Sequence, residues 1–127
     1  MGILLDDAII ILKGINEVSD KNFKTVISLG DPVFHFTYYE FLKLANSLGL
    51  EFHNNSSLVT PTFKDFFRNL GFEEYIIIDL HSSADIQLDL NILINDDNDI
   101  VNKGDLVIDG GTSHYIFNVK NLFKNIF

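Results

Sequence analysis

Hydrophobic residues follow two different spacings along the chain. Apolar side chains recur every three or four positions over residues 4–17, which predicts an amphipathic helix. Helices are also predicted over residues 37–48, 60–71 and 119–127. Short apolar runs predict strands at residues 25–29, 75–80, 85–90 and 106–108. The predicted order is therefore helix, strand, two helices, three strands and a last helix.

Local polar residues set the predicted ends of the two central helices. Thr37 and Glu40 have the spacing of a capping box, in which each side chain accepts a hydrogen bond from the other residue's backbone N–H. The next helix is expected to begin at Thr60 and Pro61, since proline favours the first helical position. Residues 51–60 and 95–102 are polar and predict exposed loops.

The strand over residues 75–80 is almost continuously apolar, which is typical of a parallel strand buried on both faces. Strands that alternate with helices favour an α/β fold. The sequence therefore predicts one Rossmann-like domain over residues 1–127. Its mostly parallel sheet would have about four strands flanked by helices.

Composition narrows the classes of partner. Eighteen acidic against nine basic residues give a formal charge of −9, which disfavours direct contact with nucleic acid or with anionic membranes. No apolar run reaches the roughly 20 residues that a membrane span requires. The chain has no cysteine, so disulfides, zinc–thiolate sites and thiol catalysis are excluded. We expect a cytoplasmic protein.

Acidic residues and glycines gather where the predicted strands end. The ends are Gly30-Asp31, Asp79, Asp89 and Asp109-Gly110-Gly111. In a parallel sheet these ends share one edge, where ligands of open α/β folds bind. The alternative is that aspartate and glycine merely end strands and cap turns. Four such ends together favour a ligand edge.

The segment from Asp105 to Asn118 (DLVIDGGTSHYIFN), followed by VKNLFKNI, resembles the fourth strand and next helix of class I S-adenosylmethionine-dependent methyltransferases. The upstream strand ends match that family in order, so the likeness covers residues 24–127, with residues 1–22 as an N-terminal helix. The resemblance implies an S-adenosylmethionine site whose residues have distinct roles. Gly30 and Asp31 would bind the methionine end, Asp79 the ribose, Asp89 and its neighbour Leu90 the adenine, and Asp109, Gly110 and Gly111 would face the methyl acceptor.

The sequence departs from the family pattern at three places. The first loop lacks the usual Gly-x-Gly, because Asp31 and Pro32 follow Gly30. His114-Tyr115 replaces a Glu-His pair, and the chain ends within the helix after the fourth strand. The family's strand order would leave that strand at the edge of an incomplete methyltransferase fold. We therefore expect either a homo-oligomer formed through this edge or a fragment of a longer chain.

Other functions stay open. The chain is either the cofactor-binding half of a methyltransferase or a non-catalytic S-adenosylmethionine-binding or assembly module of the same fold. Another nucleotide-binding α/β protein is the third alternative. His114 is the candidate general base, although a local hydrogen bond at a helix start would equally explain it.

Metal binding and aromatic stacking are weaker hypotheses. No histidine pair has helical ligand spacing, so no metal site is predicted. The aromatic residues of segment 34–39 have two possible roles, adenine stacking or core packing, of which core packing is the more common. They are Phe34, Phe36, Tyr38 and Tyr39.

Overall fold

The computed structural model describes residues 2–18, 23–52, 57–111 and 118–126. The N-terminal part contains β1 (Gly2–Ile3), α1 (Leu5–Glu17), β2 (Thr25–Leu29) and β3 (Val33–Phe34). Two helices follow, α2 (Tyr38–Ser47) and α3 (Phe63–Asn69). The C-terminal part contains β4 (Glu74–Asp79), β5 (Ile86–Gln87), β6 (Leu106–Asp109) and α4 (Val119–Ile126).

The main sheet has four parallel strands in the order β5-β4-β2-β6, and β1 pairs with β3 in a separate parallel pair. Numbered by their succession in the main sheet, its strands have the order 3-2-1-4, which is the first part of the Rossmann order. The fold is therefore α/β and Rossmann-like, as predicted. The sheet ends at β6, so the predicted edge position of the fourth strand is confirmed. The self-association expected from that edge stays a prediction.

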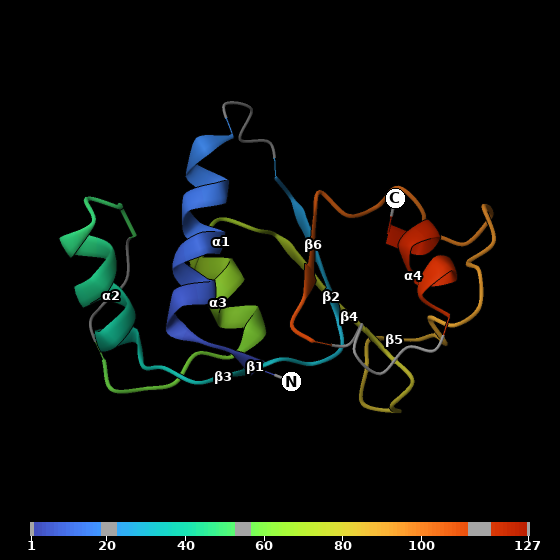
Figure 1. Cartoon of the computed structure of the whole chain (residues 1–127), viewed down its shortest axis with the longest axis horizontal. Helices are drawn as coiled ribbons and strands as arrows, with labels where there is room; N and C mark the ends of the chain where they lie inside the picture. The colour runs from blue at the N-terminus through green and yellow to red at the C-terminus, as the bar shows by residue number, and fades with distance from the viewer. Residues whose placement is uncertain (1, 19–22, 53–56, 112–117, 127) are drawn as a thin grey trace.

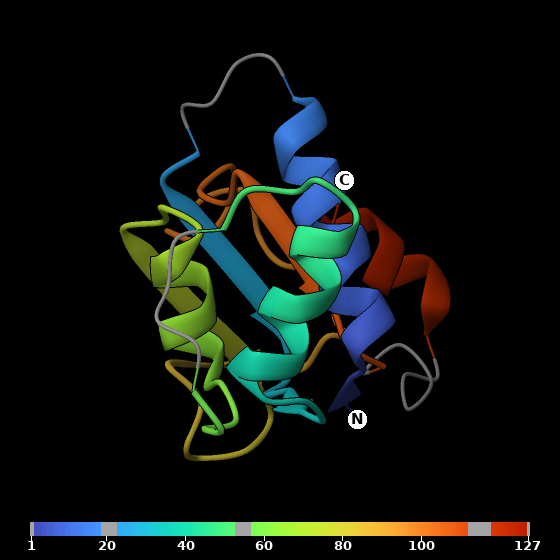
Figure 2. The same ribbon diagram turned by 90° about the vertical axis from the view of Figure 1, so that its left-hand side faces the viewer.

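Helices cover both faces of the sheet, but unequally. Figure 1 shows α1, α2 and α3 on one side of the strands and α4 on the other. Figure 2 shows the three N-terminal helices in front of the sheet. Alternate residues of β2 point to the two sides. Val26 packs in the core under α1, α2 and α3, whereas Ile27 and Leu29 pack in a second core under α4.

The larger core is mainly aromatic. Phe66 of α3 is fully buried, and five other phenylalanine rings have centroids 5.2–6.1 Å from its own. Phe34, Phe36 and Tyr38 are buried in this core, whereas Tyr39 is 47% exposed. Core packing, rather than adenine stacking, therefore accounts for three of the four aromatic residues of segment 34–39.

Backbone contacts fix the start of β2 from both sides. The Asp105 carboxylate accepts hydrogen bonds from the N–H groups of Lys24 and Thr25, both at 2.9 Å. The carbonyl oxygen of Lys24 accepts from the N–H groups of Glu73 and Glu74, also at 2.9 Å. Residues at or just before the starts of β4 and β6 therefore fix the position at which β2, which lies between them, enters the sheet.

The structure changes several predicted boundaries. β5 has two residues instead of the six predicted, because β4 ends at Asp79, which pairs with Gln87, the last residue of β5. The third helix is capped by Thr62, whose hydroxyl accepts from Asp65 N–H, so the predicted start at Thr60 and Pro61 is wrong. The capping box of Thr37 and Glu40 is confirmed. β1 and β3 were not predicted, since two-residue strands have no readable periodicity.

We expect Phe66→Ala to destabilise the protein by about 3–5 kcal/mol, the usual loss for a phenylalanine removed from a packed core. The matched control is Tyr39→Ala, which removes an exposed aromatic ring and should change stability by less than about 0.5 kcal/mol. Urea unfolding followed by circular dichroism measures both. Equal losses would contradict the aromatic core.

Asp105 should make stability depend on pH. Its two backbone hydrogen bonds lower the pKa of the carboxyl group in the folded state. The stabilisation is therefore present above the unfolded-state pKa of about 3.9 and is lost as the pH falls through the lower folded-state pKa. Because the Asp105 carboxylate is exposed to solvent, Asp105→Asn should cost at most about 1 kcal/mol at pH 7, and the difference from the wild type should be smaller at pH 3. Urea unfolding at pH 7 and pH 3 tests this, with Asp99→Asn as the control; a pH-independent difference would contradict it.

Candidate functional site

The carboxyl ends of the four parallel strands lie at one edge of the sheet, and the register brings the predicted residues at the ends of β2, β4 and β6 to nearly the same level. Leu29 pairs with Ile78 on one side and with Asp109 on the other. Gly30 is therefore level with Asp79 of β4. Because neighbouring strands are roughly 4.8 Å apart, β4 and β6 are separated by roughly 10 Å. This edge suits an extended ligand better than a single ion.

Gly30 turns the chain away from the sheet at the end of β2. Its φ of 82° lies in the left-handed region, which glycine adopts without strain. Its N–H donates to the Ile78 carbonyl at 2.7 Å, and the hydroxyl of buried Ser28 donates to the Gly30 carbonyl at 2.6 Å. Ser28 therefore shapes this loop. A polar residue inside an apolar strand was the signal available in the sequence.

Asp79 and Asp89 each stabilise a local turn. The Asp79 Oδ1 accepts from His81 N–H at 3.3 Å, and the Asp89 Oδ1 accepts from both the backbone and side-chain N–H groups of Asn91 at 2.9 Å. Both aspartates are half-buried. In both carboxylates these bonds use Oδ1, so a ligand hydroxyl or amine would approach Oδ2.

The end of β6 has a similar turn. The Asp109 Oδ1 accepts from Gly111 N–H at 3.0 Å, and the φ of Gly111 is 120°. Gly110 and Gly111 thus lie level with the loop that follows β2. His114 and the rest of segment 112–117 lie outside the described residues, so the hypothesis of a general base there stays a prediction.

The remaining predicted residues lie in different surroundings. Asp31 is exposed beside Gly30 at the carboxyl edge. Leu90 is only 4% exposed and packs in the second core, against the face of the sheet covered by α4. The structure thus brings Gly30, Asp31, Asp79 and the Asp109 turn to one edge. The adenine contact of Leu90 stays a prediction.

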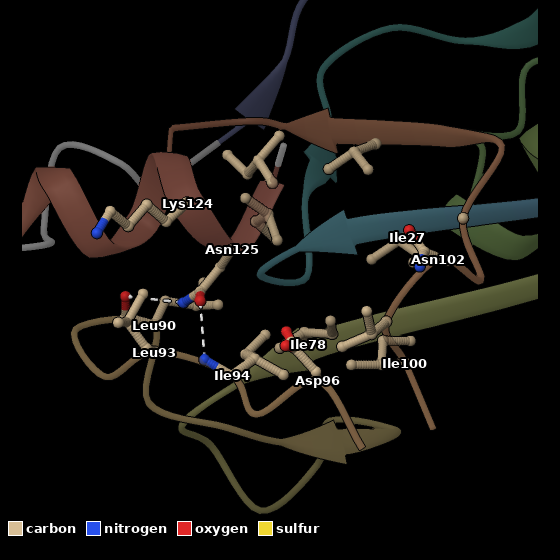
Figure 3. A pocket seen from close by; sticks show the side chains of 15 residues that line it. Ile27, Ile78, Leu90, Leu93, Ile94, Asp96, Ile100, Asn102, Lys124 and Asn125 are labelled. Carbon is tan, nitrogen blue, oxygen red and sulfur yellow. Dashed lines mark hydrogen bonds between the residues drawn. The ribbon is translucent and has the colours of Figure 1, made fainter. Parts of the chain in front are cut away.

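A cavity of about 520 Å³, which the sequence did not reveal, lies on the α4 side of the sheet (Figure 3). Its floor comes from the strands, and its walls come from the 90–104 segment and α4. At Gly104 a Cβ atom would lie 2.6 Å from the Cδ1 of Ile27, so the missing side chain lets this segment lie against β2. Asn102 adopts a left-handed φ of 59° beside it.

Asparagine side chains attach α4 to the 90–94 segment. Asn125 accepts a hydrogen bond from Ile94 N–H at 2.8 Å and donates to the Leu90 carbonyl at 3.5 Å (Figure 3). It also donates to the Ile92 carbonyl at 2.9 Å. One turn earlier, Asn121 donates to the Asn91 carbonyl at 2.8 Å. These bonds hold the helix wall of the cavity against the loop wall.

Neither a metal cluster nor a membrane span is found in the described ranges. No three histidine, aspartate or glutamate side chains there are placed to hold a metal ion. No helix of the described part is long and apolar enough to cross a membrane. Comparisons with protein-family models, curated proteins and solved structures find no match for this chain. Functional inference therefore depends on the geometry and on the sequence resemblance.

We expect Asn125→Ala to destabilise the protein by about 1–3 kcal/mol, because it leaves the N–H of Ile94 without its acceptor. Hydrogen exchange should speed up at the Ile94 amide and change little in β2. Lys120→Ala, an exposed position on the same helix, is the control. Unchanged exchange at Ile94 would show that Asn125 does not hold the loop.

Proposed function

We propose that this chain binds S-adenosylmethionine at the carboxyl edge of its main sheet, as the cofactor-binding half of a methyltransferase-like protein. The observation that carries the proposal is the common level of Gly30, Asp79 and the Asp109 turn across three adjacent parallel strands. These positions are the ones that the resemblance to class I methyltransferases assigns to the cofactor. The Rossmann-like strand order supports the same assignment.

Each residue has a chemical role in this proposal. The Asp79 carboxylate would accept hydrogen bonds from the ribose hydroxyls, while Asp89 would accept from the adenine amine. The turn at Gly30 has no side chain and so would let the methionine end approach the backbone closely. Asp109 and the two glycines after it would form the wall nearest the methyl acceptor.

Methyl transfer needs little covalent assistance from the protein. The acceptor's nucleophilic atom forms a bond to the methyl carbon as the bond from that carbon to the sulfonium sulfur breaks. The electron pair of the broken bond stays on the sulfur, which becomes a neutral thioether. Catalysis would consist mainly of holding the two reactants in line. The described residues would hold the cofactor for this step.

Calorimetric titration with S-adenosylmethionine tests the proposal. We expect saturable binding that weakens about tenfold or more in Asp79→Asn, since hydrogen bonds to a charged acceptor contribute strongly. Glu73→Gln is the matched control, because it removes an exposed carboxylate just before the opposite end of β4. Absence of binding to the wild type, or equal weakening by both substitutions, would contradict the proposed site.

The same assay separates the alternatives. Tighter binding of ATP or NAD than of S-adenosylmethionine would indicate another nucleotide-binding protein. Binding of S-adenosylmethionine without methyl transfer to any of a panel of acceptors would favour the non-catalytic module.

A further inference from the structure

The cavity beneath α4 has an aliphatic floor. Branched side chains of three adjacent strands line it, and no aromatic residue of the described part does. The volume of about 520 Å³ falls in the range of small-molecule sites. A flexible alkyl group would fill such a space, whereas a flat ring would find no stacking partner. The floor and the facing loop contribute Ile27, Leu29, Ile78, Val107, Leu90 and Ile100.

The charged groups at this cavity favour a positive ligand. In Figure 3 the Asp96 carboxylate points toward the other lining side chains, whereas the ammonium group of Lys124 points away from them. Asp96 forms no ion pair with any residue that the structure describes. Two further acids, Asp97 and Asp99, follow in the same loop, and the whole chain carries a formal charge of −9. The resulting field attracts cations.

The polar walls are held in place without a ligand. Asn125 uses both of its amide hydrogens on loop carbonyls, and the close contact of Gly104 with Ile27 fixes the far end of the loop. These contacts therefore fix α4 and the 90–104 segment, which form the walls of the cavity. Preformed walls lower the entropic cost of binding.

We propose that this cavity binds an aliphatic ammonium compound, with its alkyl chain over the floor and its charged group at Asp96. The cavity shares only Leu90 with the residues predicted to hold S-adenosylmethionine, and the proposal does not depend on the function proposed at the carboxyl edge. The ligand class follows from the aliphatic floor and from Asp96, an exposed residue that is the one acid among the described lining residues.

Calorimetry with n-alkylammonium chlorides tests this proposal. Affinity should rise roughly fourfold for each added methylene between hexyl and octyl, as expected for a chain that leaves water. Octylammonium should bind more tightly than octanoate, which has the opposite charge. Equal affinity for the two ions, or no dependence on chain length, would overturn the proposal.

Substitutions locate the charged group. Asp96→Asn should weaken octylammonium binding roughly two- to fivefold, the range for a solvent-exposed ion pair. Asp97→Asn is the matched control in the neighbouring position and should have a smaller effect. Equal effects of the two variants would show that only the general field of the loop acts, which overturns the assignment to Asp96.

Nuclear magnetic resonance distinguishes this site from the carboxyl edge. Octylammonium should shift the backbone amides of Asn102 and Gly104 and leave those of Gly30 and Gly111 unchanged. Asp79→Asn should bind octylammonium as the wild type does, whatever its affinity for S-adenosylmethionine. Shifts confined to Gly30 and Gly111, or spread evenly over the surface, would overturn the proposed location.

Discussion

The burial of β2 is the constraint on which the rest of the structure depends. All five residues of this strand are buried, and both of its edges are paired, with β4 on one side and β6 on the other. Hydrogen bonds from Lys24 and Thr25 fix its start, and the turn at Gly30 fixes its end. A slip of one residue would exchange the two faces of the strand. The same register therefore sets both cores and the carboxyl edge.

The two faces of the sheet differ in how well they are filled. Three helices and eight buried phenylalanines cover one face. The opposite face is covered by α4 and by a long segment between β5 and β6, most of it turns and loops. A helix satisfies most of its backbone hydrogen bonds internally, whereas the backbone of a turn must find other partners. A segment of turns therefore covers a sheet less continuously than a helix does. This difference explains why the described cavity lies on the aliphatic side.

Residues with strong local signals were predicted well from the sequence. The spacing of Thr37 and Glu40 determines the start of α2 through contacts within one helical turn, so a short segment contains all the information needed. The apolar runs of β2 and β4 were equally readable, because burial on both faces requires uninterrupted apolar residues. The strand order followed only from the family resemblance, since periodicity carries no information about neighbours.

Features that depend on distant contacts were not predictable. β5 ends early because its partner strand β4 ends at Asp79, and Asn125 holds a loop 31 residues away. The cavity arises from β2, β4, the 90–107 segment and α4, of which none is unusual alone. At the candidate site, the sequence could place aspartates at strand ends, but it could not show that Asp79 and Asp89 already hold turns.

These turn contacts bear directly on whether the carboxyl edge can bind a ligand. In both aspartates the hydrogen bond from the backbone of the following turn falls on Oδ1. A ligand that approaches Oδ2 would leave the turn intact, so structural capping and binding do not compete for the same atom. An asparagine retains a neutral oxygen for the turn but loses the charge that a ligand would meet. Capping of the turn therefore explains why aspartate is found at these strand ends. An asparagine variant that keeps its stability but loses ligand binding would show that the same side chain also binds the ligand.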